Sequence, residues 1–149
     1  MTLTRKALCT IYALIALLAL ISTWGHNVVY LPLGFVGANL KFWQETLVNP
    51  ASRSITLDIF YFGIAVFVWM ALEARRLQMR GFWLYVVLSM LVAISVTVPV
   101  FLIQRERKLA QLEPANQNTM ASGNAALIAA FALAVTALSV QALRMTHAP

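Results

Sequence analysis

The distribution of charge along the chain most strongly constrains its fold. Sixteen of the 149 residues are charged, and all but Asp58 fall in five short clusters separated by apolar runs. Charged clusters that border long apolar runs are typical of a chain that crosses a bilayer several times. A carboxylate at membrane depth is costly, by roughly 2.5 kcal/mol or more at the bilayer centre. Asp58 therefore needs a partner or a function.

Composition supports a membrane protein. The chain is 61% hydrophobic and 11% charged, with a mean hydropathy of +0.79, whereas soluble domains carry about 25% charged residues. The formal charge of +6 does not indicate a nucleic-acid partner, because the cations border apolar runs and no nucleic-acid fold signature accompanies them. At this length the sequence predicts one transmembrane domain over residues 1–149.

Four uncharged runs predict an all-α integral membrane protein, an up-and-down four-helix bundle. Helices are expected because lipid leaves no water for unpaired backbone groups. In the long first loop, Leu40, Trp43 and Leu47 share one helical face, and Asn39 is placed to cap the segment. This pattern predicts a short amphipathic helix on the membrane surface; an irregular loop over the bundle end is the alternative. The predicted spans cover residues 7–24, 55–72, 81–104 and 125–143.

The cationic loops favour a cell (inner) membrane protein with both termini in the cytoplasm. With the N-terminus inside, six cations lie inside (Arg5, Lys6, Arg75, Arg76, Arg80, Arg144) and five outside (Lys41, Arg53, Arg105, Arg107, Lys108). This difference is small. The shortest cationic loop contains three arginines and lies on the same side as Arg5 and Lys6, and short loops weigh most in setting topology.

Up-and-down connectivity predicts a polar cluster at one membrane face. It brings Asp58, near the start of the second span, to the depth at which the third span ends. Pro99 lacks an amide hydrogen and should free the carbonyl of Ser95. The predicted binding or structural cluster contains Asn49, Arg53, Ser95, Thr97, Pro99, Gln104 and Arg105.

Asp58 has two interpretations. It could complement the helix dipole and pair with Arg53 or Arg105, or it could be a catalytic proton donor or headgroup ligand in a desolvated site. At the other end of the second span, Glu73 and Arg76 are three residues apart and can pair on one helical face. With them we group Arg75 and Arg80 as a cytoplasmic-end charge cluster that fixes topology and binds lipid phosphates.

Metal and cofactor signatures are not found in the sequence. His26 and His147 have no second ligand at metal spacing, and the single cysteine, Cys9, allows neither a disulfide nor a thiolate cluster. No phosphate-binding glycine loop or nucleophile elbow occurs. We predict no metal site and no cofactor.

Several motifs occur in order along the chain: Asn49-Pro50-Ala51, Asp58, Glu73-Ala74-Arg75-Arg76, Trp83, Tyr85, Pro99-Val100-Phe101-Leu102 and Arg105-Glu106-Arg107. Together they resemble a family of small bacterial and plastid membrane proteins known as a domain of unknown function, whose members typically have about three membrane spans. The resemblance covers about residues 7–110, and this chain differs in its fourth span after Glu113. It implies that Asn49, Asp58, Glu73, Arg76, Pro99 and Arg105 belong to the family pattern.

Two functional hypotheses follow. The favoured one is a non-enzymatic accessory or assembly subunit of a membrane system, with membrane lipids and another membrane protein as partners. The alternative is an enzyme that binds an isoprenoid-type lipid, because the chain is similar in architecture to integral-membrane terpenoid cyclases. That similarity implies Asp58 as proton donor, with Tyr61, Phe62 and Trp69 stabilising cationic intermediates. A transporter formed by oligomerisation has less support, since no inverted repeat is evident.

Overall fold

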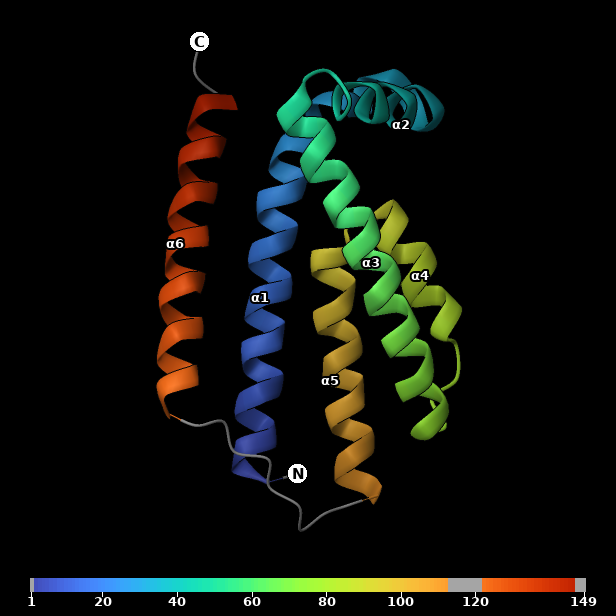
Figure 1. The fold of residues 1–149 in the computed structure, drawn as a ribbon, viewed down its shortest axis with the longest axis vertical. Helices are drawn as coiled ribbons and strands as arrows, with labels where there is room; N and C mark the ends of the chain where they lie inside the picture. Colours follow the sequence, from blue (N-terminus) through green and yellow to red (C-terminus); the bar gives the residue numbers. More distant parts are fainter. Residues whose placement is uncertain (1, 113–121, 147–149) are drawn as a thin grey trace.

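The computed structural model describes residues 2–112 and 122–146, and every regular element in these ranges is a helix (Figure 1). Three helical stretches of the described residues are long and apolar enough to cross a membrane: Leu3–Glu45, Pro50–Arg76 and Leu127–Arg144. The elements are α1 (Leu3–Asn27), the 3-10 helix η1 (Val28–Leu33), α2 (Gly34–Glu45), α3 (Pro50–Arg76), α4 (Phe82–Leu91), α5 (Ile94–Leu112) and α6 (Ser122–Thr146).

Helices α1, α3 and α6 contain the predicted first, second and fourth spans. Helix α3 begins five residues before the predicted span, because Asn49 caps it: Ser52 N donates to Asn49 Oδ1 at 2.9 Å, and Asn49 N donates to Ser52 Oγ at 3.2 Å. Pro50 at the first helical position suits this start. Asp58 is therefore the ninth residue of α3, about 12 Å along the helix, and not near its beginning.

The predicted third span, residues 81–104, is wrong as a single helix. Helix α4 ends at Leu91, α5 begins at Ile94, and the chain reverses direction between them. The Ser89 and Thr97 hydroxyls share a hydrogen bond, and the Tyr85 hydroxyl donates to Gln104. These pairs converge on the turn, so α4 and α5 form an antiparallel hairpin (Figure 1).

Contacts that are distant in sequence stabilise this reversal. Trp24 of α1 donates from Nε1 to the carbonyl of Val92 in the turn, at 3.2 Å. Pro99 lies in the second turn of α5 and does not interrupt the helix. The hairpin therefore reverses six to seven residues before Pro99, at a turn that α1 covers, and the proline does not set the reversal point.

Helix directions define two ends of the molecule. Helix α1 runs antiparallel to α5, because Arg5 contacts Glu106 and Cys9 approaches the Ile103 carbonyl. Helix α6 runs parallel to α1, since the last turn of α6 packs where α1 ends (Figure 1); a Cβ on Gly25 would lie 2.5 Å from Leu143 Cδ2. We call the end where α1 begins and α3 and α5 end the basic end, and the opposite end the α2 end.

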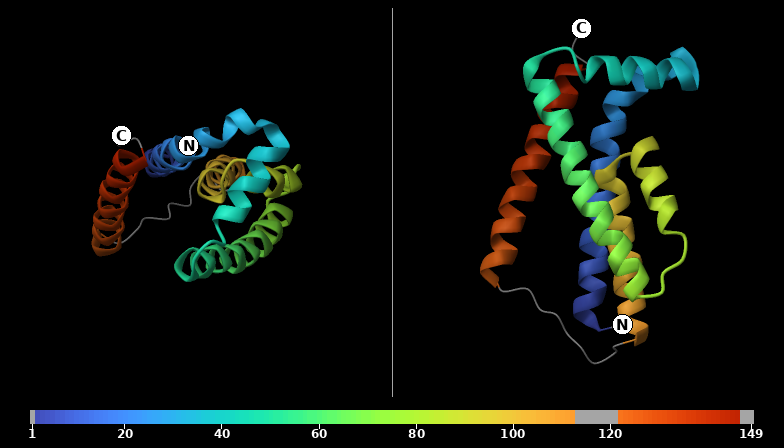
Figure 2. Two further views of the ribbon diagram at one scale, coloured as in Figure 1. Left: turned by 90° about the horizontal axis from the view of Figure 1, so that it is seen from above. Right: turned by 45° about the vertical axis from the view of Figure 1, so that its right-hand side comes forward.

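This arrangement differs from an up-and-down four-helix bundle. Leu3 lies at the basic end and the last turn of α6 at the α2 end (Figure 2), whereas four antiparallel spans would bring both termini to one end. The physical reason is the hairpin: α4 and α5 together leave and return to the basic end. An odd number of long helices then separates the two chain ends.

The buried core lies between α3, α4 and α5, toward the basic end. Met70 and Phe101 are fully buried, and Phe101 makes T-shaped contacts with Trp69 and Tyr85 at centroid distances of 5.9 and 5.4 Å. Most other apolar side chains are exposed, including Leu14, Leu133 and many more on the outer faces of α1, α3 and α6. Exposed apolar surface on this scale is expected where lipid surrounds the helices.

The amphipathic segment predicted in the first loop is α2, which lies across the end of the bundle (Figure 2). Its Trp43 ring stacks on Phe60 of α3 at 5.5 Å. The predicted cap, Asn39, is wrong: Asn39 lies inside the helix, where its amide donates to the Phe35 carbonyl at 2.8 Å. The helix begins earlier because η1 leads into it directly from α1.

Candidate functional site

A cavity of about 850 Å³ lies at the α2 end. We call it the aromatic cavity. It is bordered by the last turns of α1, by η1 and α2, by the first half of α3, and by the α4–α5 turn, and it is open on one side. Its position follows from two features of the fold: α2 lies across the bundle end, and the hairpin reverses before it reaches that end. The space that a full third span would occupy is therefore left open.

Aromatic and aliphatic side chains form most of the wall. Trp24 closes the side toward the turn, and Phe42 and Trp43 contribute from α2. The rings contact one another, with Phe42 edge-on to Trp43 at a centroid distance of 5.2 Å. Further apolar wall residues are Leu31, Phe35, Ile59, Phe60, Ile64, Phe67, Met90, Leu91 and Ile94. Such a surface binds apolar groups by removing them from a polar environment.

A few polar groups lie at the edge of the cavity. The Tyr30 hydroxyl donates to the Glu45 carboxylate, which also pairs with Lys41 at 3.2 Å. The Thr56 hydroxyl donates to the Thr46 carbonyl at 3.2 Å and ties the end of α2 to α3. These bonds hold α2 over the cavity. They also supply the small number of oriented polar groups that fix a ligand in an otherwise apolar site.

Asp58 does not line the aromatic cavity. Its side chain is exposed on α3, and within residues 2–112 and 122–146 it has no hydrogen bond or ion pair. The expected partners lie elsewhere: Arg53 Nη1 donates to the Leu47 carbonyl at 3.1 Å, and Arg105 contacts Glu73 and Glu106. The aromatic residues grouped with Asp58, namely Tyr61, Phe62 and Trp69, are likewise absent from the cavity wall.

The predicted polar cluster is not assembled at one place. Asn49 and Arg53 lie at the α2 end, whereas Gln104 and Arg105 lie in the half of α5 nearer the basic end. Ser95, Thr97 and Pro99 lie near the hairpin turn; Ser95 lines the cavity, and Thr97 and Pro99 are buried. The predicted cluster requires residues 81–104 to form one continuous helix. Reversal of the chain at Val92–Ala93 inverts the direction of α5 and separates the cluster.

At the basic end, a buried ion-pair network joins α1, α3 and α5. Glu106 accepts from Arg105 Nη1 at 2.8 Å and contacts Arg5 Nη1 at 3.5 Å. Arg105 Nε donates to Glu73 Oε1 at 2.7 Å, and Arg76 Nε lies 3.4 Å from Glu73 Oε2. Arg5, Glu106 and Glu73 are only 5%, 6% and 8% exposed.

This network includes the Glu73–Arg76 pair that the spacing indicates. The sequence does not point to Arg5 or Glu106 as site residues, and it predicts Arg105 beside Asp58, whereas the structure joins all three in the network. Arg75 and Arg80 of the cytoplasmic-end cluster stay exposed. The only sequence signal for the pairing is that Glu106 stands between two arginines, which does not reveal its contact with Arg5 of α1, 101 residues earlier.

Within the two described ranges, no group of three or more His, Cys, Asp or Glu side chains is placed to hold a metal ion. His26 lines the aromatic cavity, where its ring is one of the few polar groups. His147 lies outside the described residues.

The fold and composition together define a helical membrane protein with three long apolar helices and a short hairpin. The family described as "Protein of unknown function DUF2834" matches residues 11–107, about two thirds of the chain, and the protein belongs to this family. The match covers α1 through most of α5, and so includes both the aromatic cavity and most of the ion-pair network, while α6 lies outside it. No curated protein and no solved structure matches the chain.

Proposed function

We propose that the chain is a non-enzymatic membrane protein, an accessory or assembly subunit that holds the apolar chain of an isoprenoid-type lipid in the aromatic cavity. One observation carries the proposal: a half-open cavity of about 850 Å³ with largely apolar and aromatic walls, bordered by helices of a membrane protein. Its volume lies within the range of roughly 300–1,000 Å³ typical of ligand pockets. Aromatic rings give large apolar contact with an unsaturated chain.

The chemistry of the wall supports binding over catalysis. No carboxylate is among the described residues that line the cavity. The Glu45 carboxylate at its edge is already bound by Tyr30 and Lys41, so no carboxylic acid faces a bound alkene. Asp58, the proton donor of the alternative hypothesis, lies outside this wall. A general acid must come within hydrogen-bond reach of the reacting group, and the position of Asp58 does not favour that role.

We propose that the basic end lies in the cytoplasm, in the bacterial inner (cell) membrane. The hairpin brings Arg105, Arg107 and Lys108 to the same end as Arg5 and the α3 arginines, so eight of the eleven lysines and arginines gather there. Lys41, Arg53 and Arg144 remain at the α2 end. The positive-inside rule then favours a cytoplasmic N-terminus, as the sequence also predicts. The parallel course of α6 supports a C-terminus on the opposite side, in place of two cytoplasmic termini.

Mass spectrometry of the gently solubilised full chain tests the binding proposal. The wild type is expected to retain a stoichiometric apolar lipid. Ala38→Trp places a large ring in the cavity wall, and we expect it to lower lipid occupancy about tenfold by filling the site. Ala134→Trp, on the exposed face of α6, is the matched control and should retain the lipid. Absence of lipid in the wild type, or equal occupancy in both variants, would contradict the proposal.

Reporter fusions test the orientation. A reporter that is active only after export should be active when fused after Pro149 and inactive when fused before Met1. Activity at neither terminus would instead support two cytoplasmic ends and an even number of crossings.

A further inference from the structure

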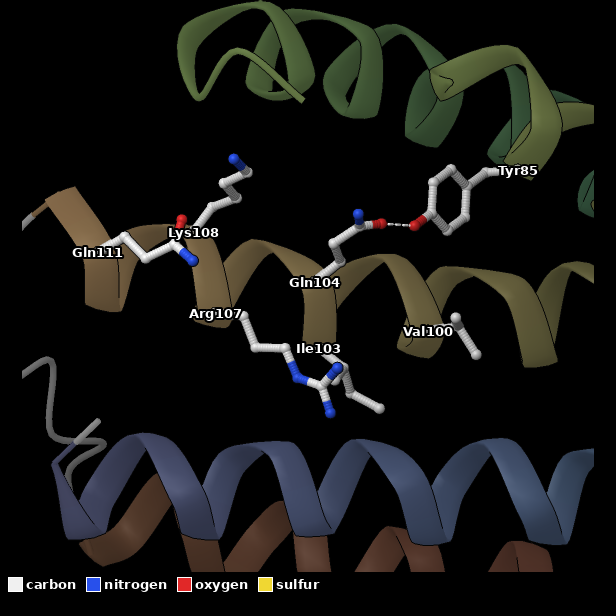
Figure 3. A pocket seen from close by; sticks show the side chains of 7 residues that line it. All are labelled: Tyr85, Val100, Ile103, Gln104, Arg107, Lys108 and Gln111. Carbon is white, nitrogen blue, oxygen red and sulfur yellow. Dashed lines mark hydrogen bonds between the residues drawn. The ribbon is translucent and has the colours of Figure 1, made fainter. Parts of the chain in front are cut away.

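A second hollow, of about 340 Å³, lies along α5 on the side of the basic end (Figure 3). One face of α5 forms nearly all of it, and Tyr85 of α4 completes it. Its polar side chains are Gln104, Arg107, Lys108 and Gln111, at helical spacings of three and four residues. We call this hollow the basic groove. It does not overlap the aromatic cavity and does not depend on the function proposed for that cavity.

The two cations of the basic groove differ from the cations beside them. Arg5, Arg76 and Arg105 are neutralised by Glu73 and Glu106. In contrast, Arg107 and Lys108 have no ion pair or hydrogen bond with any described residue. The nearby carboxylates that the structure describes, Glu73 and Glu106, are already engaged by other arginines, so no described carboxylate neutralises Arg107 and Lys108.

Tyr85 orients a further donor toward the groove. Its hydroxyl donates to the Gln104 side-chain oxygen (Figure 3). That bond occupies the oxygen and leaves the Gln104 amide hydrogens for another acceptor. An arginine, a lysine and oriented amide donors form the set that binds phosphate oxygens in proteins.

The groove also changes in polarity along the helix. Val100 and Ile103 lie one to two turns closer to the hairpin turn, and Arg107, Lys108 and Gln111 follow toward the end of α5. An apolar wall that leads to a cationic one matches a molecule whose phosphate is attached to a hydrocarbon chain. A soluble phosphate ion has no hydrocarbon group that could contact Val100 and Ile103.

We propose that the basic groove binds the phosphodiester headgroup of an anionic phospholipid. The phosphate contacts Lys108 and accepts from the Gln104 amide on the α4 side of α5, and Arg107 adds positive charge on the α1 side of the same hollow (Figure 3). The first part of an acyl chain lies against Val100 and Ile103. Tyr85 acts as a positioning residue through Gln104. The site differs from the cluster assigned from the sequence, in which Arg75 and Arg80 on α3 bind lipid phosphates.

The test uses the full chain in a neutral detergent, with phosphatidylglycerol as the probe and native mass spectrometry to count bound lipids. We expect one tightly bound lipid. The double variant Arg107→Gln/Lys108→Gln should weaken it roughly 25-fold, because each basic residue near an anionic headgroup contributes about a factor of five. The matched control Lys6→Gln/Arg144→Gln removes the same charge from exposed positions outside the groove, and should stay within about threefold of wild type.

Two further experiments distinguish lipid binding in the basic groove from nonspecific attraction of anions. Tyr85→Phe removes the bond that orients Gln104 and should weaken phosphatidylglycerol about fivefold, while Trp83→Phe, elsewhere on α4, should not. Inorganic phosphate at millimolar concentration should fail to displace the lipid. Displacement by phosphate would overturn the lipid assignment in favour of a soluble phosphate ligand. An equal loss in the control double variant would overturn the site.

Discussion

The two ends of this molecule use polar side chains in opposite ways. At the basic end, Glu73 and Glu106 are buried and engaged by arginines from three helices. At the α2 end, the charged pair Lys41–Glu45 is largely exposed, and the space beneath α2 is a cavity. At the basic end, buried ion pairs join the helices directly. At the α2 end, aromatic contacts join α2 to α3 around a cavity.

The largest expected effect is at the basic end. Glu106→Gln removes the charge that Arg5 and Arg105 share and leaves Arg5 buried without that carboxylate. Breaking a buried pair by removing one partner costs about 3–5 kcal/mol. We expect that loss in the free energy of unfolding, measured by denaturant titration in detergent.

Glu45→Gln is the control for this prediction, because its pair with Lys41 is exposed. Exposed pairs contribute about 0–1 kcal/mol, so this variant should unfold almost as the wild type does. An equal loss of stability in both variants would contradict the inference that the buried ion pairs of the basic end contribute more than the exposed pair of the α2 end.

A smaller effect is expected from Trp43→Ala. The Trp43 ring stacks on Phe60 and joins α2 to α3 across the cavity. Removing one ring of an aromatic pair costs about 0.5–1.5 kcal/mol beyond the loss of buried area. Hydrogen exchange should therefore become faster in the amides of α2, while the amides of α5 near Glu106 should keep their protection.

Trp83→Ala serves as the control, since Trp83 is 63% exposed and lies on α4 away from the cavity. Faster amide exchange in α2 of the Trp83→Ala variant would mean that loss of overall stability exposes α2. In that case the contact between Trp43 and Phe60 would not be what protects its amides.

The smallest effect is expected from Asp58→Asn. The carboxylate has no partner among the described residues, so its removal breaks no ion pair or hydrogen bond, and the free energy of unfolding should not fall, because a charge on an apolar helix in lipid is itself costly. Lipid occupancy of the aromatic cavity, read by mass spectrometry, should also stay unchanged.

A loss of lipid-derived product in cells that carry Asp58→Asn, with normal insertion and stability, would instead revive the enzyme hypothesis. A loss of capture of a membrane partner would point to an intermolecular contact at Asp58. Either outcome would give Asp58 a function of its own, separate from lipid binding in the aromatic cavity.

The fold was predictable where local composition decides it. Spans within α1, α3 and α6 follow from uncharged runs of sufficient length, and Asn49-Pro50 is a recognisable helix start. The Glu73–Arg76 pair follows from helical spacing. The candidate site was much less predictable. The placement of Asp58 beside Arg105 failed because it relied on the direction of the third apolar run.

What the sequence determined by itself is the long apolar helices α1, α3 and α6 and their membrane character, because apolar burial and backbone hydrogen bonding in lipid accumulate residue by residue along a local stretch. Only the tertiary structure decided that residues 82–112 turn back on themselves. A run of this length is compatible with a crossing or with a hairpin. The choice depends on contacts with distant partners, such as Trp24 with Val92 and Arg5 with Glu106, whose free energy appears only when the helices are already packed together.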